Sequence, residues 1–135
     1  MKKTVYNPKA LVAPIGHFDR AVRLGDWLFI SGTSALTNVS GPMSQRQLVS
    51  GIEAQTRETL NNIETVLKDA GGTLENIYEI RVILKSREDF PVVDRILRDR
   101  MPKRGFIAHG YEGTLLHPQM ELEIEANAYL GPTES

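Results

Sequence analysis

Alternating apolar and polar residues predict a strand near the end of the chain. Between positions 120 and 129 every second residue is apolar, and the residues between them include Glu121, Glu123 and Glu125. A period of two indicates a strand with one buried face, so the three carboxylates share the other face. Periodicity alone does not separate the roles of these three glutamates.

The remaining strands and loops follow from the same alternation and from turn residues. The segment 21–32 predicts two short strands around Gly25-Asp26, a dipeptide that favours a tight hairpin turn. Further strands are expected at 4–6, 78–84 and 105–109. Surface loops rich in small and polar residues are expected over 33–44 and 110–118.

Two segments carry apolar residues at the three- and four-residue spacing of a helix buried on one side. The first helix is expected over 45–70, and Gly71-Gly72 ends it because glycine adopts the left-handed C-cap conformation at low cost. Its apolar stripe is Leu48, Ile52, Thr56, Leu60, Ile63 and Leu67. The second helix is expected over 87–101, with acidic residues and Pro91 in its first turn.

The resulting order, β-β-β-α-β-α-β-β, predicts an α+β two-layer domain in which both helices cover one face of a mixed sheet. Residues 1–135 are expected to form one domain, because a chain of this length can bury one sizeable core. The other sheet face carries Glu79, Arg81 and the three glutamates of the last strand. That face would be solvated in a monomer and could form an interior in an oligomer.

Composition narrows the classes of function. The formal net charge of −1 gives no electrostatic support for binding nucleic acid or anionic lipid. No apolar run approaches the roughly 18 residues of a membrane span, and the absence of cysteine fits the cytoplasm, where we expect this protein. His17, His109 and His117 lack the spacing of metal ligands, so they are expected at the surface or in loops, and no metal site is predicted.

Arg104 and Glu123 occupy positions where a charged side chain could bind a substrate or take part in catalysis. Arg104 precedes an expected strand, where its guanidinium could bind a substrate carboxylate through two parallel hydrogen bonds. Alternatively, Lys103 and Arg104 complement the dipole of the preceding helix. Glu123 could position a water as a general acid/base, or it could be an exposed strand residue paired with Arg81. From the pattern alone, the structural interpretation is favoured for both residues.

Several segments together resemble the reactive intermediate deaminase (RidA/YjgF) family. They are PIGHFDRAVRLGDWLFISG at 14–32, IEAQTRETLNNIETVLKDAGGTLENI at 52–77, the strand and EDF helix start at 78–90, and ELEIEANAYL at 121–130. The resemblance implies a chorismate-mutase-like fold and a homotrimer, with the sheets facing inward as a barrel and three sites between subunits. It also implies hydrolysis of 2-imino acids such as 2-iminopropionate and 2-iminobutyrate to the 2-keto acid and ammonia, without a cofactor.

Carried over to this chain, the family's site includes six positions besides the arginine. Glu123 matches the glutamate of the family's last strand, and Ser31-Gly32 matches a pair expected to offer backbone groups to the substrate. Phe18 stands where tyrosine is usual, which removes a hydroxyl, and His17 replaces a proline before it. Asp94 replaces an asparagine of the second helix and adds negative charge near the cleft.

The family's substrate-binding arginine has two possible counterparts here. PKRG supplies Arg104 after Pro102, although Gly105 replaces the usual hydroxyl residue. An alignment without a gap before Glu123 places Ile107 or Ala108 at that position instead, and the chain would then lack the arginine. The first alignment, which requires extra residues in the loop over 110–118, is favoured because surface loops tolerate insertions.

The favoured function is therefore hydrolytic deamination of an imine or enamine carboxylate in a homotrimer. The segments SGTS at 31–34 and LLHPQMELEIEANAY at 115–129 are similar to the 2-aminomuconate deaminase branch, which acts on an enamine dicarboxylate in aromatic-ring degradation. A third hypothesis is a trimer that binds a small metabolite without turnover.

Overall fold

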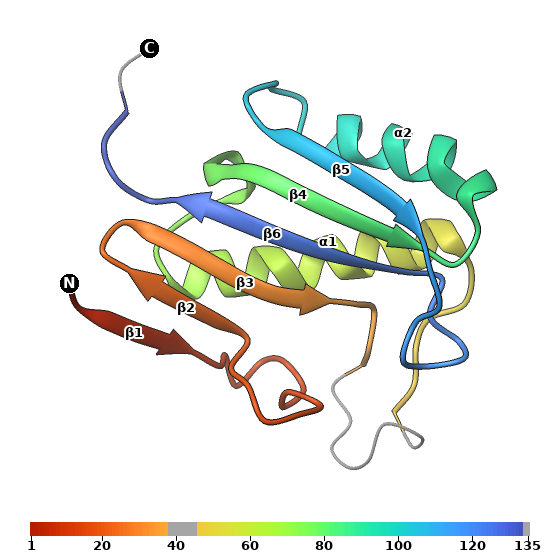
Figure 1. Ribbon diagram of the computed structural model, residues 1–135, viewed down its shortest axis with the longest axis horizontal. Helices are drawn as coiled ribbons and strands as arrows, with labels where there is room; N and C mark the ends of the chain where they lie inside the picture. Colours follow the sequence, from red (N-terminus) through yellow and green to blue (C-terminus); the bar gives the residue numbers. More distant parts are fainter. Residues whose placement is uncertain (38–45, 134–135) are drawn as a thin grey trace.

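The computed structural model describes residues 1–37 and 46–133 (Figure 1). Within these residues the chain forms one sheet of six strands, and both α-helices lie on the same face of that sheet. The strands are Lys3–Tyr6 (β1), Ala21–Leu24 (β2), Trp27–Thr33 (β3), Ile77–Leu84 (β4), Ile107–Glu112 (β5) and Leu122–Tyr129 (β6). The helices are Ile52–Asp69 (α1) and Phe90–Arg100 (α2). The predicted α+β two-layer arrangement and the predicted order of elements are confirmed.

The sheet order is β1-β2-β3-β6-β4-β5, which places the last strand of the chain at the centre. Neighbouring strands are antiparallel except β4 and β5, whose parallel pairing follows from the crossover through α2. The sheet is therefore mixed, as expected. Because β6 pairs with both β3 and β4, residues of the chain's two halves meet along it.

The alternation of β6 sorts its residues between two faces as predicted. Its apolar side chains are at most 1% exposed and pack toward the helices; they are Leu122, Ile124, Ala126 and Ala128. The helices contribute Leu60, Ile63, Leu67, Val93 and Ile96 to the same core. The side chains of Glu121, Glu123, Glu125 and Asn127 are partly exposed on the opposite, open face.

The first helix begins later than the apolar stripe predicts. Gly51 has φ 94°, a conformation that L side chains rarely adopt, and α1 starts at the next residue. Leu48 was expected on the helix, but it forms an isolated β-bridge with Leu36. The expected start at position 45 and most of the expected 33–44 loop lie outside the described residues.

Three strand boundaries or faces also differ from expectation. A β-bulge between Ile77 and Glu79 turns Tyr78 to the open face, where its ring lies 5.3 Å from that of Trp27. Tyr78 was expected on the buried face, because simple alternation cannot register an extra residue. The strand predicted over 105–109 occupies Ile107–Glu112, because its parallel pairing with β4 continues to Leu84 at the end of β4. The last strand, β6, begins at Leu122 rather than at position 120.

A buried amide on α1 joins this helix to two distant segments. Gln55 is 2% exposed, and its Nε2 donates hydrogen bonds to the carbonyl oxygens of Val49 at 2.9 Å and Gln119 at 2.8 Å. Its Oε1 accepts a hydrogen bond of 2.8 Å from the backbone N–H of Glu121. The side chain therefore fixes the chain before α1 and the chain that enters β6.

Replacing this amide should destabilise the fold strongly. In Gln55→Met the side-chain volume is kept, but two carbonyl groups and one N–H group lose their partner. We expect the free energy of unfolding to fall by about 3 kcal/mol, because each unpaired buried polar group is unfavourable. Urea denaturation measures the change. Gln47→Met, the same substitution at an exposed position, is the control, and equal effects of the two substitutions would contradict the prediction.

Candidate functional site

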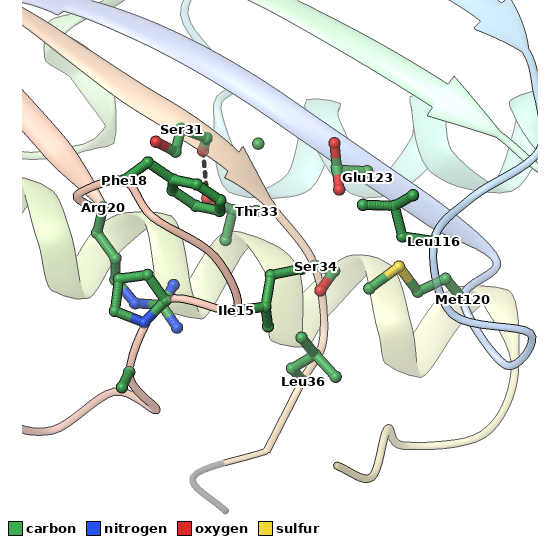
Figure 2. Close-up of a pocket in the computed structure, with 13 residues that line it drawn as sticks. Ile15, Phe18, Arg20, Ser31, Thr33, Ser34, Leu36, Leu116, Met120 and Glu123 are labelled. Atoms are coloured by element: carbon green, nitrogen blue, oxygen red, sulfur yellow. Dashed lines mark hydrogen bonds between the residues drawn. The ribbon is translucent and has the colours of Figure 1, made fainter. Parts of the chain in front are cut away.

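A cavity of about 290 Å³ lies where the end of β3 meets the start of β6 (Figure 2). Its walls come from the segment between β1 and β2, from the residues at and after the end of β3, from the loop before β6, and from β6 itself. The lining residues are Ala13, Pro14, Ile15, Phe18, Arg20, Ser31, Gly32, Thr33, Ser34, Leu36, Leu116, Met120 and Glu123. This set is largely apolar with a few polar groups, as in small-molecule sites.

Glu123 is the carboxylate of this cavity. Burial, followed by repulsion from Glu125, raises the pKa of Glu123 above the ordinary glutamate value. Among the described residues it has neither a hydrogen bond nor an ion pair, so no cation opposes this shift. The position suits a group that exchanges protons, since perturbed carboxyl groups in clefts are typical of acid/base sites.

Gly32 allows this carboxylate to lie close to β3. A Cβ atom added at Gly32 would lie 2.8 Å from Glu123 Cδ, closer than real Cβ contacts allow. The backbone at Gly32 is not left-handed, so no turn demands a glycine here, and the missing Cβ leaves space that the Glu123 carboxylate occupies. The contact therefore connects two of the residues expected in the site.

A β-bulge shapes the wall that Ser31 and Gly32 form. Ile30 pairs with Ala126 and Thr33 with Ile124, so two residues of β3 face a single residue of β6. Ser31 was expected to offer backbone groups to a substrate, but its N–H donates to the Arg20 carbonyl at 2.8 Å and its carbonyl accepts the Thr33 hydroxyl at 2.8 Å. Its hydroxyl donates to the Asp19 carbonyl at 2.6 Å. Ser31 thus holds the wall in shape.

Phe18 covers one side of the cavity. Its side chain is 50% exposed, and Figure 2 shows the ring beside Ser31 and Thr33, across the cavity from Glu123. The ring offers an apolar surface without the hydroxyl of a tyrosine. Four expected site residues, Phe18, Ser31, Gly32 and Glu123, therefore line one cavity.

The other expected site residues lie elsewhere on the same chain. Asp94 and Arg104 line a second cavity of about 590 Å³ between α2 and β5. The Asp94 carboxylate accepts a 2.6 Å bond from Arg98, whereas exposed Arg104 has no hydrogen bond or ion pair within the described residues. Ile107 is 59% exposed on β5. Within one chain, Arg104 and Glu123 do not share a cavity.

The other carboxylates of the open face belong to a network. Arg81 forms ion pairs with Glu79 at 3.3 Å and with Glu125 at 3.8 Å. Asn127 Nδ2 donates to Glu79 Oε1 at 2.9 Å, and His109 Nε2 lies 3.8 Å from Glu79. Glu125 thus shares a cation, in contrast to Glu123. The structural interpretation of Glu123, in which it pairs with Arg81, is therefore wrong, because Arg81 pairs with Glu125 instead.

Two residues near the cavity, one half-buried and one buried, escaped the sequence analysis. Arg20 lines the cavity, and no local pattern distinguishes it from a surface arginine. His117 was expected at the surface or in a loop; it is in a loop but only 5% exposed. Its Nδ1 accepts a bond from Gln119 N–H, which leaves Nε2 to donate to the Arg46 carbonyl at 3.2 Å. It is a structural link between loops.

The part of the chain that the structure describes contains no candidate metal site and no candidate membrane-spanning helix. Within it, no group of three or more histidine, aspartate or glutamate side chains could hold a metal ion. In the same residues, neither helix is long and apolar enough to cross a membrane.

The chain is similar to known proteins over nearly its whole length. A family model described as endoribonuclease L-PSP matches residues 8–130. A 2-iminobutanoate/2-iminopropanoate deaminase of Mus musculus is 31% identical over 137 residues, which cover 98% of this chain and 94% of the relative. A RutC family protein of Pyrococcus horikoshii is 30% identical over 130 residues, covering 96% and 98%. The crystal structure of RidA from the Antarctic bacterium Psychrobacter sp. has a TM-score of 0.84 at 22% identity, covering 93% of this chain and 98% of that chain.

The raised pKa of Glu123 predicts that the effect of the substitution Glu123→Gln on stability depends on pH. The folded state holds this proton more tightly than the unfolded chain, so the stability contributed by the neutral carboxyl is present below the unfolded pKa of about 4.3. That contribution is lost as the pH rises through the folded pKa. Glutamine stays neutral throughout, so Glu123→Gln should gain stability relative to the wild type between pH 4 and pH 7.

Thermal melting of both proteins across this pH range measures the effect. Glu88→Gln, at an exposed position outside the cavity, controls for the change in net charge. If the melting temperatures of the wild type and Glu123→Gln change in parallel with pH, the charged form of Glu123 is not destabilised by the fold.

Proposed function

The chain belongs to the RidA/YjgF family. From this membership and the cavity geometry we propose that it hydrolyses reactive 2-imino acids or their enamine tautomers. The products are the 2-keto acid and ammonia. The observation that carries the proposal is the Glu123 carboxylate, which lines a small, largely apolar cavity without a cation among the described residues. The likeness to a mouse 2-iminobutanoate/2-iminopropanoate deaminase supports the same reaction class.

Glu123 is proposed to hold a water against the imine carbon. A carboxylate with a raised pKa is a stronger base than an ordinary glutamate, so it takes a proton from the attacking water more readily. The same group then returns the proton to the nitrogen, and it takes up the hydroxyl proton as the C–N bond breaks, the C=O bond forms and ammonia departs. Since an iminium carbon is already electrophilic, positioning of the water supplies much of the required rate enhancement.

Arg104 is proposed to bind the substrate carboxylate from a neighbouring subunit. It does not line the cavity of Glu123 in its own chain, so the two residues can act on one substrate only across an interface. Large apolar side chains exposed on the open face of the sheet support an oligomer, because exposed apolar surface of this size is typical of interfaces. They are Val5, Trp27, Phe29, Ile107 and Tyr111, each between 42% and 59% exposed. A homotrimer with three such sites is the assembly we propose.

Two other functions are less well supported. The description of the family model names a ribonuclease, but a net charge of −1 gives no electrostatic basis for binding RNA. A trimer that binds a metabolite without turnover would be consistent with the departures at Phe18 and Asp94. Turnover measurements separate this alternative from the proposed deaminase.

Removal of either proposed active-site group should slow the reaction. Glu123→Gln and Arg104→Ala are each expected to reduce ammonia release from enzymatically generated 2-iminobutyrate at least about tenfold, because one loses the base and the other the carboxylate ligand. Glu88→Gln and Arg95→Ala, at exposed positions away from the cavity, are the matched controls. Wild-type rates in both site variants would refute this assignment, and a wild type that releases no ammonia would favour the binding function.

Mixing the two inactive variants tests whether the site is shared between subunits. If Glu123 and Arg104 come from different subunits, an equimolar mixture reassembled from unfolded chains forms some sites with both residues intact. Random assembly should restore about a quarter of the wild-type activity, whereas either variant alone stays inactive. Light scattering should give three times the chain mass of 15.1 kDa. No recovery of activity in a correctly assembled mixture, or a monomer mass, would contradict the shared site.

A further inference from the structure

Arg20 provides a second charged group in the cavity of Glu123. Figure 2 shows Arg20 and Glu123 on opposite sides of the cavity, with Phe18 and Thr33 between them. Within the described residues the two do not form an ion pair, and no other carboxylate pairs with Arg20. The cavity therefore presents a cation and a carboxylate that do not neutralise each other.

The guanidinium of Arg20 is held in place by the fold. Its Nε and Nη2 donate to the carbonyl oxygen of Val12 at 3.1 and 2.6 Å, which leaves Nη1 without a partner in the described part of the chain. The backbone of Arg20 is fixed on both sides, by Asn7 Oδ1 at 3.0 Å and by Ser31 N–H at 2.8 Å. A fixed guanidinium loses little conformational entropy when it binds an anion.

The surroundings of Arg20 favour an anion. Burial, followed by repulsion from Arg46, lowers the pKa of Arg20, which means that its charge is poorly compensated. Arg46 itself donates to the carbonyl of Ala13 at 2.6 Å, so two guanidinium groups hold adjacent carbonyl groups at this side of the cavity. An anionic ligand group placed here would reduce the repulsion between them.

We propose that Arg20 binds a second anionic group of the substrate, one that lies away from the carbon attacked under Glu123. The preferred substrates are then imines or enamines with two carboxylates, one at the reacting end and one at the distal end. The cavity supports this class, because Arg20 lines it on the side opposite Glu123, away from the carbon that is attacked. The inference rests on the proposed function for the reaction, but binding of the distal carboxylate can be tested without turnover.

Product-like ligands test this specificity directly. Isothermal titration at pH 7 compares 2-oxoglutarate, which has a distal carboxylate, with 2-oxopentanoate, which has the same carbon chain without it. The wild type should bind 2-oxoglutarate at least about tenfold more tightly, since a guanidinium–carboxylate pair adds binding free energy. Arg20→Met should remove the difference, and Arg20→Lys should keep part of it.

Two other variants separate this role from a structural one. Arg104→Ala should weaken both ligands by the same factor, because it is proposed to bind the carboxylate that both share. Arg95→Met, on the exposed side of α2, should leave the preference unchanged. If Arg20→Met fails to fold, the wild-type preference and its decrease in Arg20→Lys still decide the question.

Equal or undetectable binding of the two ligands by the wild type, or a preference that persists in a folded Arg20 variant, would overturn the inference. Turnover measured in parallel keeps the two proposals apart. Hydrolysis of imines without any preference for dicarboxylates would refute the role of Arg20 alone. Selective binding of 2-oxoglutarate through Arg20 without hydrolysis of any imine would refute the deaminase and retain the anion site.

Discussion

The buried amide of Gln55 is the constraint on which the geometry of the cavity depends. It joins α1 to the loop that enters β6 and to the residues before the helix. A second amide, that of Asn62 two turns further along α1, donates to the carbonyl of Ser34 at 2.9 Å and so fixes the chain that leaves β3. The cavity lies between these two segments, and one helix therefore sets the separation of its walls.

This arrangement explains why α1 buries two amides on a side where a helix of a small domain usually buries apolar residues. Gln55 is 2% exposed and Asn62 is 5% exposed. An apolar side chain at Gln55 or Asn62 would add hydrophobic burial, but it could not pair the backbone groups of irregular segments, which need partners when buried. Two walls built from non-strand backbone at the ends of β3 and β6 thus require side-chain amides behind them.

Periodicity was sufficient for the regular parts of the fold and insufficient where backbone irregularities occur. It predicted the buried face of β6 and the side of α1 that carries Leu60, Ile63 and Leu67. It placed the start of α1 too early because the apolar Leu48 continues the stripe, although Gly51 interrupts the helix. It also missed the bulge at Tyr78, since an extra residue changes the register without changing the composition.

The candidate site was predictable to the extent that a motif marks it. Three glutamates alternate equally along the last strand, and only the family resemblance distinguished Glu123. The structure adds a physical difference, because Glu125 shares Arg81 and Glu123 faces the cavity. The separation of Arg104 from Glu123 depends on contacts between distant segments, which local sequence does not encode. Arg20 was missed for the same reason.

The separation of Arg20 and Glu123 has a chemical consequence that links the two proposals. A direct ion pair between them would favour the charged carboxylate and lower its pKa, which would remove the basicity that activation of a water requires. Val12 holds the guanidinium on one side of the cavity, and the carboxylate lies against Gly32 on the other. The fold thus places a cation in the same cavity as a carboxylate that has no ion pair within the described part of the chain. In the two proposals the cation acts on the substrate, and the base keeps its raised pKa until the substrate binds.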